Sequence, residues 1–311
     1  MTGRDRASPY SESPVLFAHR WLAAVLLLSA CAPEPRTGAT ALIDDHGDTV
    51  QVAAAPAQRI VSLNPATTEA LFAMGAGARV VGRTHWDLYP EAARAVPDLG
   101  AGMQPNVEAV LGARPDLVVL YASAGNRDAA TKLRAAGVRV IALRTDHVAD
   151  LRRMLGILGR AVGDTLAAIA VADSVEATLA AVRAMPRYAT PPRLFWRLWD
   201  GPIMTVGRGS FLHELVEIAG GTTLFADRPE PSPTIALEEI VRRDPDFIVT
   251  GPVSLAAWRM EARWQTIPAA RAGRFLVVDT ALVGRPGVRM GEAARHLRAL
   301  LDSAASAAPR R

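Results

Sequence analysis

The chain has 311 residues, a length that corresponds to about two average domains. Hydrophobic residues make up 50% and charged residues 21%, a balance that excludes intrinsic disorder, collagen-like repeats and a polytopic membrane protein. The formal net charge is +4, but Lys132 is the only lysine and no basic stripe interleaved with aromatics occurs, so we expect no nucleic-acid partner. A single cysteine, Cys31, excludes an internal disulfide and a cysteine-built metal site.

The N-terminus has the pattern of a bacterial lipoprotein signal peptide. His19 and Arg20 precede an apolar run of about a dozen residues, which is too short for a bilayer span but typical of a signal-peptide core. The run ends in Leu28-Ser29-Ala30-Cys31, which resembles a lipobox. We therefore expect a signal peptide over 1–30, lipidation of Cys31 and a flexible tether over 31–41. The folded part would then work outside the cytoplasm, in the periplasm or on the cell surface, with a lipid anchor in the membrane.

Short apolar strands and helices alternate in the first half of the mature chain. Asn64 is placed to cap a helix that begins at Pro65 and stops at Gly75. A second helix is expected over 126–136, and strands are expected at 60–63, 80–81, 116–120 and 138–143. This alternation predicts a parallel sheet with helices on both faces, within an N-terminal α/β lobe over 42–160.

A longer helix is predicted over 164–186. Asp164 can cap it, Pro186 stops it, and about 21 residues at ~1.5 Å each span about 32 Å, enough to join two lobes. Its Asp173 and Glu176 argue against a membrane span, and its apolar stripe comprises Leu166, Ile169, Val175, Leu179 and Val182. The alternation then restarts in a C-terminal lobe over 190–306, with strands at 193–199, 203–206, 247–250 and 275–278 and helices at 211–219 and 288–301.

An internal repeat relates the two halves. Segment 107–119 can be laid over 237–249, an offset of 130 residues, with Glu, Pro, Asp and the final Val identical and the apolar positions matched. Each copy has the pattern of a short helix, a Pro-Asp turn and a buried strand. The sequence therefore predicts an α/β fold of two similar lobes with parallel central sheets, joined by one long rigid helix.

The block from Arg59 to Gly75 resembles the opening of ABC-importer substrate-binding proteins of the cobalamin, haem and ferric-siderophore class. Blocks 106–119, 220–221 and 284–287 are similar to later parts of that family, so the resemblance covers about residues 42–302. It implies a cleft between the lobes that holds a large metal chelate, and an ABC permease dimer as partner. Cobalamin-binding members are the most similar, because they resemble this chain in the order of Trp86, Tyr89-Pro90, Asn106-Val107-Glu108 and Tyr121 along the sequence. A haem or ferric-siderophore binder remains the alternative.

Candidate ligand-binding residues lie on the loops around the expected cleft. Ligands of open parallel sheets sit beyond the carboxyl ends of the strands, and pockets favour domain interfaces. The candidates are Asn64, His85, Trp86, Tyr121, Trp196, Trp199 and Arg285. The aromatic rings suit flat contact with a macrocycle, and Arg285 suits a carboxylate, phosphate or propionate. Because Trp196 and Trp199 are three apart in a strand, at most one should line the pocket, while Trp258 and Trp264 should pack in a core.

Other chemistry is not expected. The sequence indicates no enzyme, no catalytic residue and no cofactor, because Gly207-Arg208-Gly209-Ser210-Phe211 is not a nucleophile elbow. The six histidines lack close metal-binding spacing, so no metal site is expected. Three alternatives stay open. They are a bare-metal site built from His85, His147 and His213, haem ligation by His85 or Tyr121, and an extracytoplasmic enzyme on the same fold.

Glu108 and Glu238 occupy the same position in the two repeats. Each lies near the start of its short helix, where the helix dipole favours a carboxylate. The family resemblance implies a further role, in which an acidic residue on each lobe meets arginines on the two permease subunits. We therefore expect Glu108 and Glu238 to dock the protein, acting as a monomer, on its importer.

Overall fold

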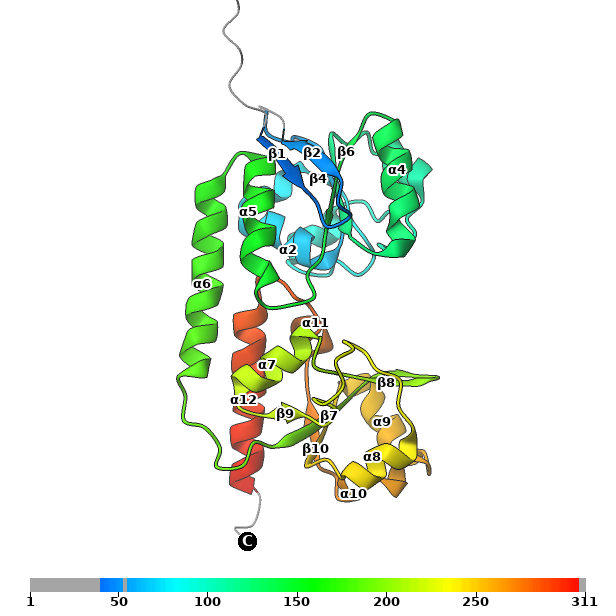
Figure 1. The fold of residues 1–311 in the computed structure, drawn as a ribbon, viewed down its shortest axis with the longest axis vertical. Coiled ribbons are helices and arrows are strands. Elements are labelled where there is room, and N and C mark those ends of the chain that lie inside the picture. Colours follow the sequence, from blue (N-terminus) through cyan, green and yellow to red (C-terminus); the bar gives the residue numbers. More distant parts are fainter. Residues whose placement is uncertain (1–39, 53–54, 308–311) are drawn as a thin grey trace, which may run out of the picture. The chain divides into compact units, whose positions relative to one another are not determined.

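The computed structural model describes residues 40–52 and 55–307 (Figure 1). The predicted signal peptide, Cys31 and all but the end of the tether lie outside the described residues. Thr40 and Ala41, which we assigned to the tether, instead begin β1 (Thr40–Ile43), which pairs antiparallel with β2 (Thr49–Val52). Asp44 in the hairpin turn accepts a hydrogen bond from Arg134 at 2.7 Å and so joins the hairpin to the N-terminal lobe.

The N-terminal lobe contains a parallel sheet with strand order β4-β3-β5-β6. Its strands are β3 (Ile60–Leu63), β4 (Val80–Gly82), β5 (Leu117–Tyr121) and β6 (Arg139–Leu143). The connecting helices are α2 (Pro65–Ala73), α3 (Val107–Gly112), α4 (Arg127–Ala135) and α5 (Asp150–Val162), with 3-10 turns at Gly77–Arg79, Glu91–Ala95 and Ala124–Asn126. The sheet confirms the predicted strands, whereas α5 was not predicted.

The C-terminal lobe repeats this strand order. Strands β9, β7, β10 and β11 lie side by side and parallel, and β8 adds an antiparallel edge to β7. The strands are β7 (Arg193–Asp200), β8 (Ile203–Thr205), β9 (Thr222–Thr223), β10 (Phe247–Thr250) and β11 (Phe275–Val277). The helices are α7 (Phe211–Ala219), α8 (Leu237–Arg243), α9 (Pro252–Met260), α10 (Pro268–Arg271), α11 (Thr280–Val283) and α12 (Met290–Ala307), with a 3-10 turn at Trp264–Thr266.

The two copies of the internal repeat form corresponding hydrogen bonds in the two lobes. The Arg59 side chain donates to the Ala113 carbonyl at 2.7 Å, where α3 has just ended, and Arg193 donates to the Arg243 carbonyl, the equivalent position at the end of α8, at 2.6 Å. The Asp of each Pro-Asp turn accepts from the backbone at the start of the neighbouring strand. These bonds are Gln58 N to Asp116 and Arg193 N to Asp246, both 2.8 Å. Equivalent contacts in both lobes confirm the prediction of two similar α/β lobes.

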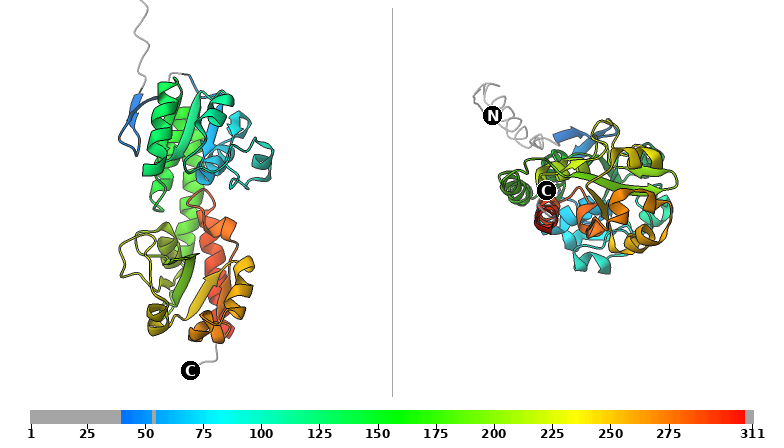
Figure 2. Two further views of the ribbon diagram at one scale, coloured as in Figure 1. Left: turned by 90° about the vertical axis from the view of Figure 1, so that its right-hand side faces the viewer. Right: turned by 90° about the horizontal axis from the view of Figure 1, so that it is seen from below.

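The predicted long helix is α6 (Thr165–Arg183), with Asp164 accepting from the Ala167 N–H as its N-cap. It packs against α5 of the first lobe and α12 of the second (Figures 1 and 2). The predicted apolar stripe is partly wrong, because Leu166 is 78% exposed and Ile169 is 49% exposed. The buried positions are Ala168, Ala172, Val175, Leu179 and Val182, so small alanines let neighbouring helices approach closely.

Among the described helices, α6 is the one with sufficient length and apolar composition for a membrane span. Its buried residues belong to a core cluster that also includes residues of α5, α7 and α12. Arg152 of α5 additionally bonds Asp173 and Glu176 at 2.6 Å each. Through these contacts α6 packs against both lobes and connects them.

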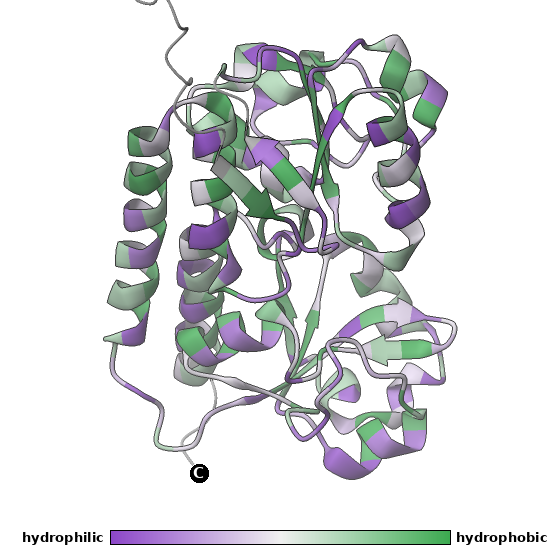
Figure 3. Cartoon of the chain, turned by 45° about the horizontal axis from the view of Figure 1, so that its top comes forward, coloured by the Kyte–Doolittle hydropathy of each residue, from purple (hydrophilic) through white to green (hydrophobic). Residues whose placement is uncertain are grey.

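Each lobe also has a hydrophobic cluster of its own, separate from the cluster that contains the buried residues of α6. The strands of the sheets are coloured mainly hydrophobic in Figure 3. In the C-terminal lobe, Trp258 and Trp264 are fully buried with ring centroids 4.5 Å apart, which confirms the prediction that they pack. The Arg197 guanidinium lies 4.7 Å from the Trp258 ring. The strands of the first sheet are buried along most of their length, as expected for a sheet with helices on both faces.

Candidate ligand-binding cleft

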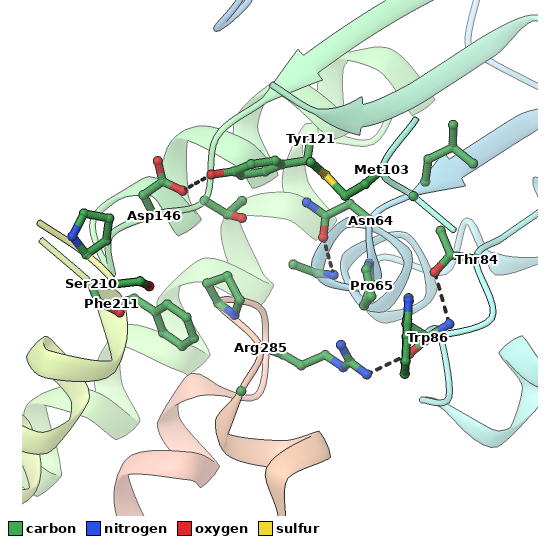
Figure 4. A pocket seen from close by; sticks show the side chains of 18 of the residues that line it. Asn64, Pro65, Thr84, Trp86, Met103, Tyr121, Asp146, Ser210, Phe211 and Arg285 are labelled. Atoms are coloured by element: carbon green, nitrogen blue, oxygen red, sulfur yellow. Dashed lines mark hydrogen bonds between the residues drawn. The ribbon is translucent and has the colours of Figure 1, made fainter. Parts of the chain in front are cut away.

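A cavity of about 550 Å³ lies between the two lobes (Figure 4). The N-terminal lobe supplies residues just beyond strands β3, β4, β5 and β6, because the carboxyl ends of parallel strands meet at one edge. The C-terminal lobe supplies the residues before and at the start of α7, a proline-containing loop and the segment after α11. The lining includes Asn64, Thr84, Trp86, Met103, Tyr121, Asp146, Ser210, Phe211, Pro231 and Arg285.

A tight turn holds Trp86 at the cleft. The buried Asp87 carboxylate accepts from the Thr84 hydroxyl and the Thr68 hydroxyl, both at 2.6 Å, and from the Thr84 N–H at 3.2 Å. Burial raises the pKa of Asp87 although these hydrogen bonds act in the opposite direction. The Trp86 side chain is 57% exposed. The Trp86 ring therefore remains accessible at the cleft, on a backbone that is held by the hydrogen bonds of the turn.

Arg285 reaches Trp86 from the opposite lobe. Its guanidinium donates to the Trp86 carbonyl at 2.7 Å (Figure 4). Burial lowers the pKa of Arg285, and the charges of Glu69 and Asp87 act against that effect. The residue therefore joins the lobes across the cleft, and its positive charge lies near the carboxylates of Glu69 and Asp87.

A buried ion pair lies behind Arg285. Arg289 donates two hydrogen bonds to Glu69, at 3.0 and 2.8 Å, and lies 4.0 Å from the ring centroid of Tyr89. Burial raises the pKa of Glu69, and the Arg289 hydrogen bonds offset part of that rise. Glu69 is on α2 and Arg289 precedes α12, so this pair also joins the two lobes.

Tyr121 ends β5 and forms a hydrogen bond inside the cleft. Its hydroxyl donates to Asp146 Oδ1 at 2.5 Å. Burial, followed by the hydrogen bond and the charge of Asp146, raises the pKa of Tyr121 to about 12. The phenolate form of Tyr121 is therefore disfavoured at neutral pH.

Four of the seven candidate ligand residues line this cavity, namely Asn64, Trp86, Tyr121 and Arg285. Asn64 also caps α2, with Oδ1 accepting from the Ala66 N–H at 2.9 Å. His85 is exposed beside Trp86, with ring centroids 4.5 Å apart, and is outside the lining. Trp196 and Trp199 are outside it too, since Trp196 is 5% exposed in the core and Trp199 is 63% exposed on the β7–β8 hairpin.

Sequence reasoning missed Met103, Asp146, Ser210 and Phe211. Asp146 follows β6 in the same way that Tyr121 ends β5, so the strand-end rule, applied to every strand, would have found it. Phe211 starts α7, and its N–H donates to the Asp146 carbonyl at 2.8 Å. That contact joins distant parts of the chain, and no local pattern predicts it.

The alternative bare-metal site is not assembled. Within residues 40–52 and 55–307, no group of three His, Cys, Asp or Glu could hold a metal ion. His147 Nδ1 instead bonds Glu214 at 2.6 Å, and His213 Nδ1 bonds the Thr223 hydroxyl at 2.7 Å. The three histidines thus have separate surroundings.

The pair of His147 and Glu214 is another contact between the lobes and predicts a pH dependence. Its hydrogen bond raises the pKa of His147 above the ordinary 6.5. A raised histidine pKa contributes stability that is fully present below pH 6.5 and is lost as the pH rises through the folded-state value. Because the His147 side chain is 50% exposed, we expect His147→Ala to cost less than about 1 kcal/mol. Thermal melting of both proteins from pH 5 to 9 should show the largest difference at low pH, and a constant difference would contradict this assignment.

Glu108 and Glu238 are exposed on the first turns of α3 and α8. Neither forms an ion pair within the described part of the chain, whereas the neighbouring Glu239 bonds Arg243 at 2.8 Å. Glu108 also borders a hollow of about 730 Å³ between α3 and α4. Neither glutamate lines the ligand cleft.

Known proteins share this fold and sequence pattern. The family model described as periplasmic binding protein matches residues 60–282. A vitamin B12-binding protein of Vibrio vulnificus (strain CMCP6) is 26% identical over 241 residues, covering 77% of this chain and 88% of the relative. A cobalamin-binding protein of Halobacterium salinarum (strain ATCC 29341 / DSM 671 / R1) is 32% identical over 252 residues, covering 76% of this chain and 67% of the relative.

Solved structures of known proteins have a similar fold. A periplasmic heme-binding protein from Roseiflexus sp. RS-1 in apo form has a TM-score of 0.73 and 26% identity, covering 80% of this chain and 99% of that one. The periplasmic vitamin B12-binding protein of Vibrio cholerae has a TM-score of 0.70 and 25% identity, with coverage of 80% and 98%. From the match over residues 60–282 and the two-lobed α/β fold, we conclude that the chain belongs to the periplasmic binding protein family.

Proposed function

We propose that this protein is an extracytoplasmic solute-binding protein that captures a cobalamin-like metal chelate and delivers it to an ABC importer. The observation that carries the proposal is the cleft between the lobes, where Trp86 and Tyr121 lie opposite Phe211 and Arg285. A volume of about 550 Å³ falls within the range of small-molecule sites, and apolar walls with few polar groups are typical of them. The names of the relatives, for vitamin B12, cobalamin and heme, support the same ligand class.

The state of Tyr121 favours a chelate that brings its own axial ligands. A tyrosine that ligates haem iron binds as the anion, but the Tyr121 hydroxyl donates to Asp146 and its pKa is raised to about 12. His85, the other candidate axial ligand, is outside the lining. A corrinoid needs no ligand from the protein, so we place it before haem. A ferric siderophore also supplies the ligands of its own metal, and we place the corrinoid before it because curated relatives are vitamin B12- and cobalamin-binding proteins. Haem and ferric siderophores remain the alternatives.

Trp86→Ala tests the proposed site. The purified protein is titrated with cyanocobalamin, hemin and a ferric siderophore, and binding is followed by tryptophan fluorescence and ligand absorbance. We expect saturable binding of cyanocobalamin, and loss of the Trp86 ring should weaken it by about 1–3 kcal/mol, the effect of a buried aromatic anchor. Trp199→Ala is the matched control, because this exposed ring lies outside the cleft lining. Equal affinities of wild type and Trp86→Ala would contradict the site.

We further propose that Glu108 and Glu238 dock the protein, as a monomer, on a permease dimer. Their exposure, their lack of described ion-pair partners and their equivalent positions in the two lobes support this role. Charge pairs across such an interface govern association rate and specificity. The repeat places one carboxylate on each lobe, which suits a partner made of two similar subunits.

We also propose that lipidation of Cys31 anchors the protein to the membrane, on the basis of the lipobox pattern at 28–31. Metabolic labelling with a fatty acid should mark the wild type and leave Cys31→Ser unlabelled, because the thiol is the group that accepts the lipid. A single acyl chain holds a protein only weakly, so stable retention needs at least two chains. Equal labelling of both proteins would contradict the anchor.

A further inference from the structure

We propose that Asp146 selects the ligand by charge, favouring a chelate whose rim carries neutral amides, as a corrinoid does, over one whose rim carries carboxylates, as haem does. The inference rests on the proposed function, because it assigns the chemistry of the ligand edge that the same cleft accepts. It concerns the periphery of the macrocycle and is separate from the ligation of the metal.

Contacts on three sides hold Asp146 in position. Its N–H donates to Asp150 Oδ2 at 3.0 Å, its carbonyl accepts from the Phe211 N–H at 2.8 Å, and Oδ1 accepts from the Tyr121 hydroxyl at 2.5 Å. These partners come from α5, from the opposite lobe and from β5. A group that is ordered before binding loses little conformational entropy when a ligand arrives.

The part of the cleft wall formed by Tyr121 and Asp146 can accept further hydrogen bonds but has no free hydrogen to donate. Tyr121 uses its one hydroxyl hydrogen on Asp146 Oδ1, and Oδ2 makes no hydrogen bond within residues 40–52 and 55–307. Both residues line the cleft (Figure 4). An amide N–H on the ligand supplies the matching donor and forms a charge-assisted bond. A carboxylate at the same place supplies no donor and adds a like charge.

The negative charge of Asp146 has no ion-pair partner among the described residues. The charged groups around it are otherwise engaged, since Asp150 lies 3.2 Å from Arg153 and Glu214 lies 2.6 Å from His147. The positive charge of Arg144 acts on Tyr121, but Arg144 is exposed, so solvent and salt screen it.

The positive charge of Arg285, at the other side of the cleft, has negative charges close to it. Arg285 and Arg289 lie with the buried carboxylates Glu69 and Asp87, a cluster whose formal charges sum to zero. Arg285 also donates a hydrogen bond to the Trp86 carbonyl. Arg285 has two buried carboxylates close to it, whereas the cations that act near Asp146 are exposed. A ligand edge therefore meets the charge of Asp146 less compensated than that of Arg285, the other charged residue of the lining.

The test compares hemin with hemin dimethyl ester, which share ring and iron and differ in two carboxylates, alongside cyanocobalamin. We expect the wild type to bind the ester at least about tenfold tighter than the diacid, because like charges brought together at an interface are costly. Asp146→Asn keeps the shape and an acceptor for Tyr121 and should reduce that preference about tenfold. Asp128→Asn, which removes an exposed carboxylate of α4 that pairs with Lys132 at 2.8 Å, should keep that preference.

The outcomes separate this inference from the proposed function. If cyanocobalamin binds and Asp146→Asn shows the wild-type preference, the assignment of Asp146 is wrong and the proposed function stands. If Asp128→Asn loses the preference equally, net charge rather than Asp146 selects the ligand. Tyr121→Phe retains the carboxylate and should retain the preference, and its loss there would assign selection to Tyr121. If the wild type binds none of the three, the proposed function falls and this inference with it.

Discussion

A variant that carries both Glu108→Arg and Glu238→Arg is expected to lose ligand uptake while it binds the ligand with wild-type affinity. Both carboxylates are exposed on the first turns of equivalent helices and lie outside the cleft lining. Reversing a charge that faces an arginine places like charges together, which costs several kcal/mol at an interface. Two such reversals should reduce uptake by more than about a hundredfold.

Uptake of labelled ligand into cells and equilibrium binding to the purified protein are the two measurements. The control is the double variant Glu91→Arg with Glu217→Arg, which makes the same change in net charge, one residue in each lobe, at exposed positions outside α3 and α8. Normal uptake by the Glu108/Glu238 variant would exclude the docking assignment. Loss of binding would show instead that these glutamates support the fold or the cleft.

Arg289→Leu is expected to destabilise the protein by about 3–5 kcal/mol at pH 7, because it leaves the Glu69 carboxylate buried without its counter-charge. Burial already raises the pKa of Glu69 in the wild type, and loss of Arg289 removes the hydrogen bonds that offset this rise. Protonation of Glu69 then relieves the buried charge. The destabilisation relative to wild type should therefore shrink as the pH falls from 7 to 5.

Thermal and urea unfolding at both pH values measure this effect. Adding Glu69→Leu to Arg289→Leu should recover most of the lost stability, since replacing both members of a buried pair with apolar residues is often nearly neutral. Arg295→Leu, an exposed position of α12, is the control for the loss of a positive charge. A double variant no more stable than Arg289→Leu would show that packing of Arg289 on Tyr89, rather than the charge of Glu69, dominates.

Several elements were predicted well because their signals are local. Strands β3 and β10 and helix α7 have the predicted bounds, and α6 begins one residue after its predicted cap, Asp164. An apolar run of four residues, a capping side chain and a stopping glycine act within a few residues of one another. Helix α5 is amphipathic and is followed by Gly163 in the left-handed conformation, so its sequence also carries a local signal for a helix.

By itself the sequence determined the two lobes, their parallel sheets and the connecting helix, because hydrophobic periodicity and an internal repeat are properties of the chain order. The class of the protein was indicated by the resemblance of several sequence blocks to a known family. Only the tertiary structure decided which side chains line the cleft. Trp86 stands there because Asp87 and Arg285 hold its turn, and Trp199 does not, because it lies on the exposed β7–β8 hairpin. Asp146 became part of the site through contacts with Tyr121 and Phe211. Such contacts join residues far apart in the chain, and their geometry exists only once both lobes have packed against the shared helices.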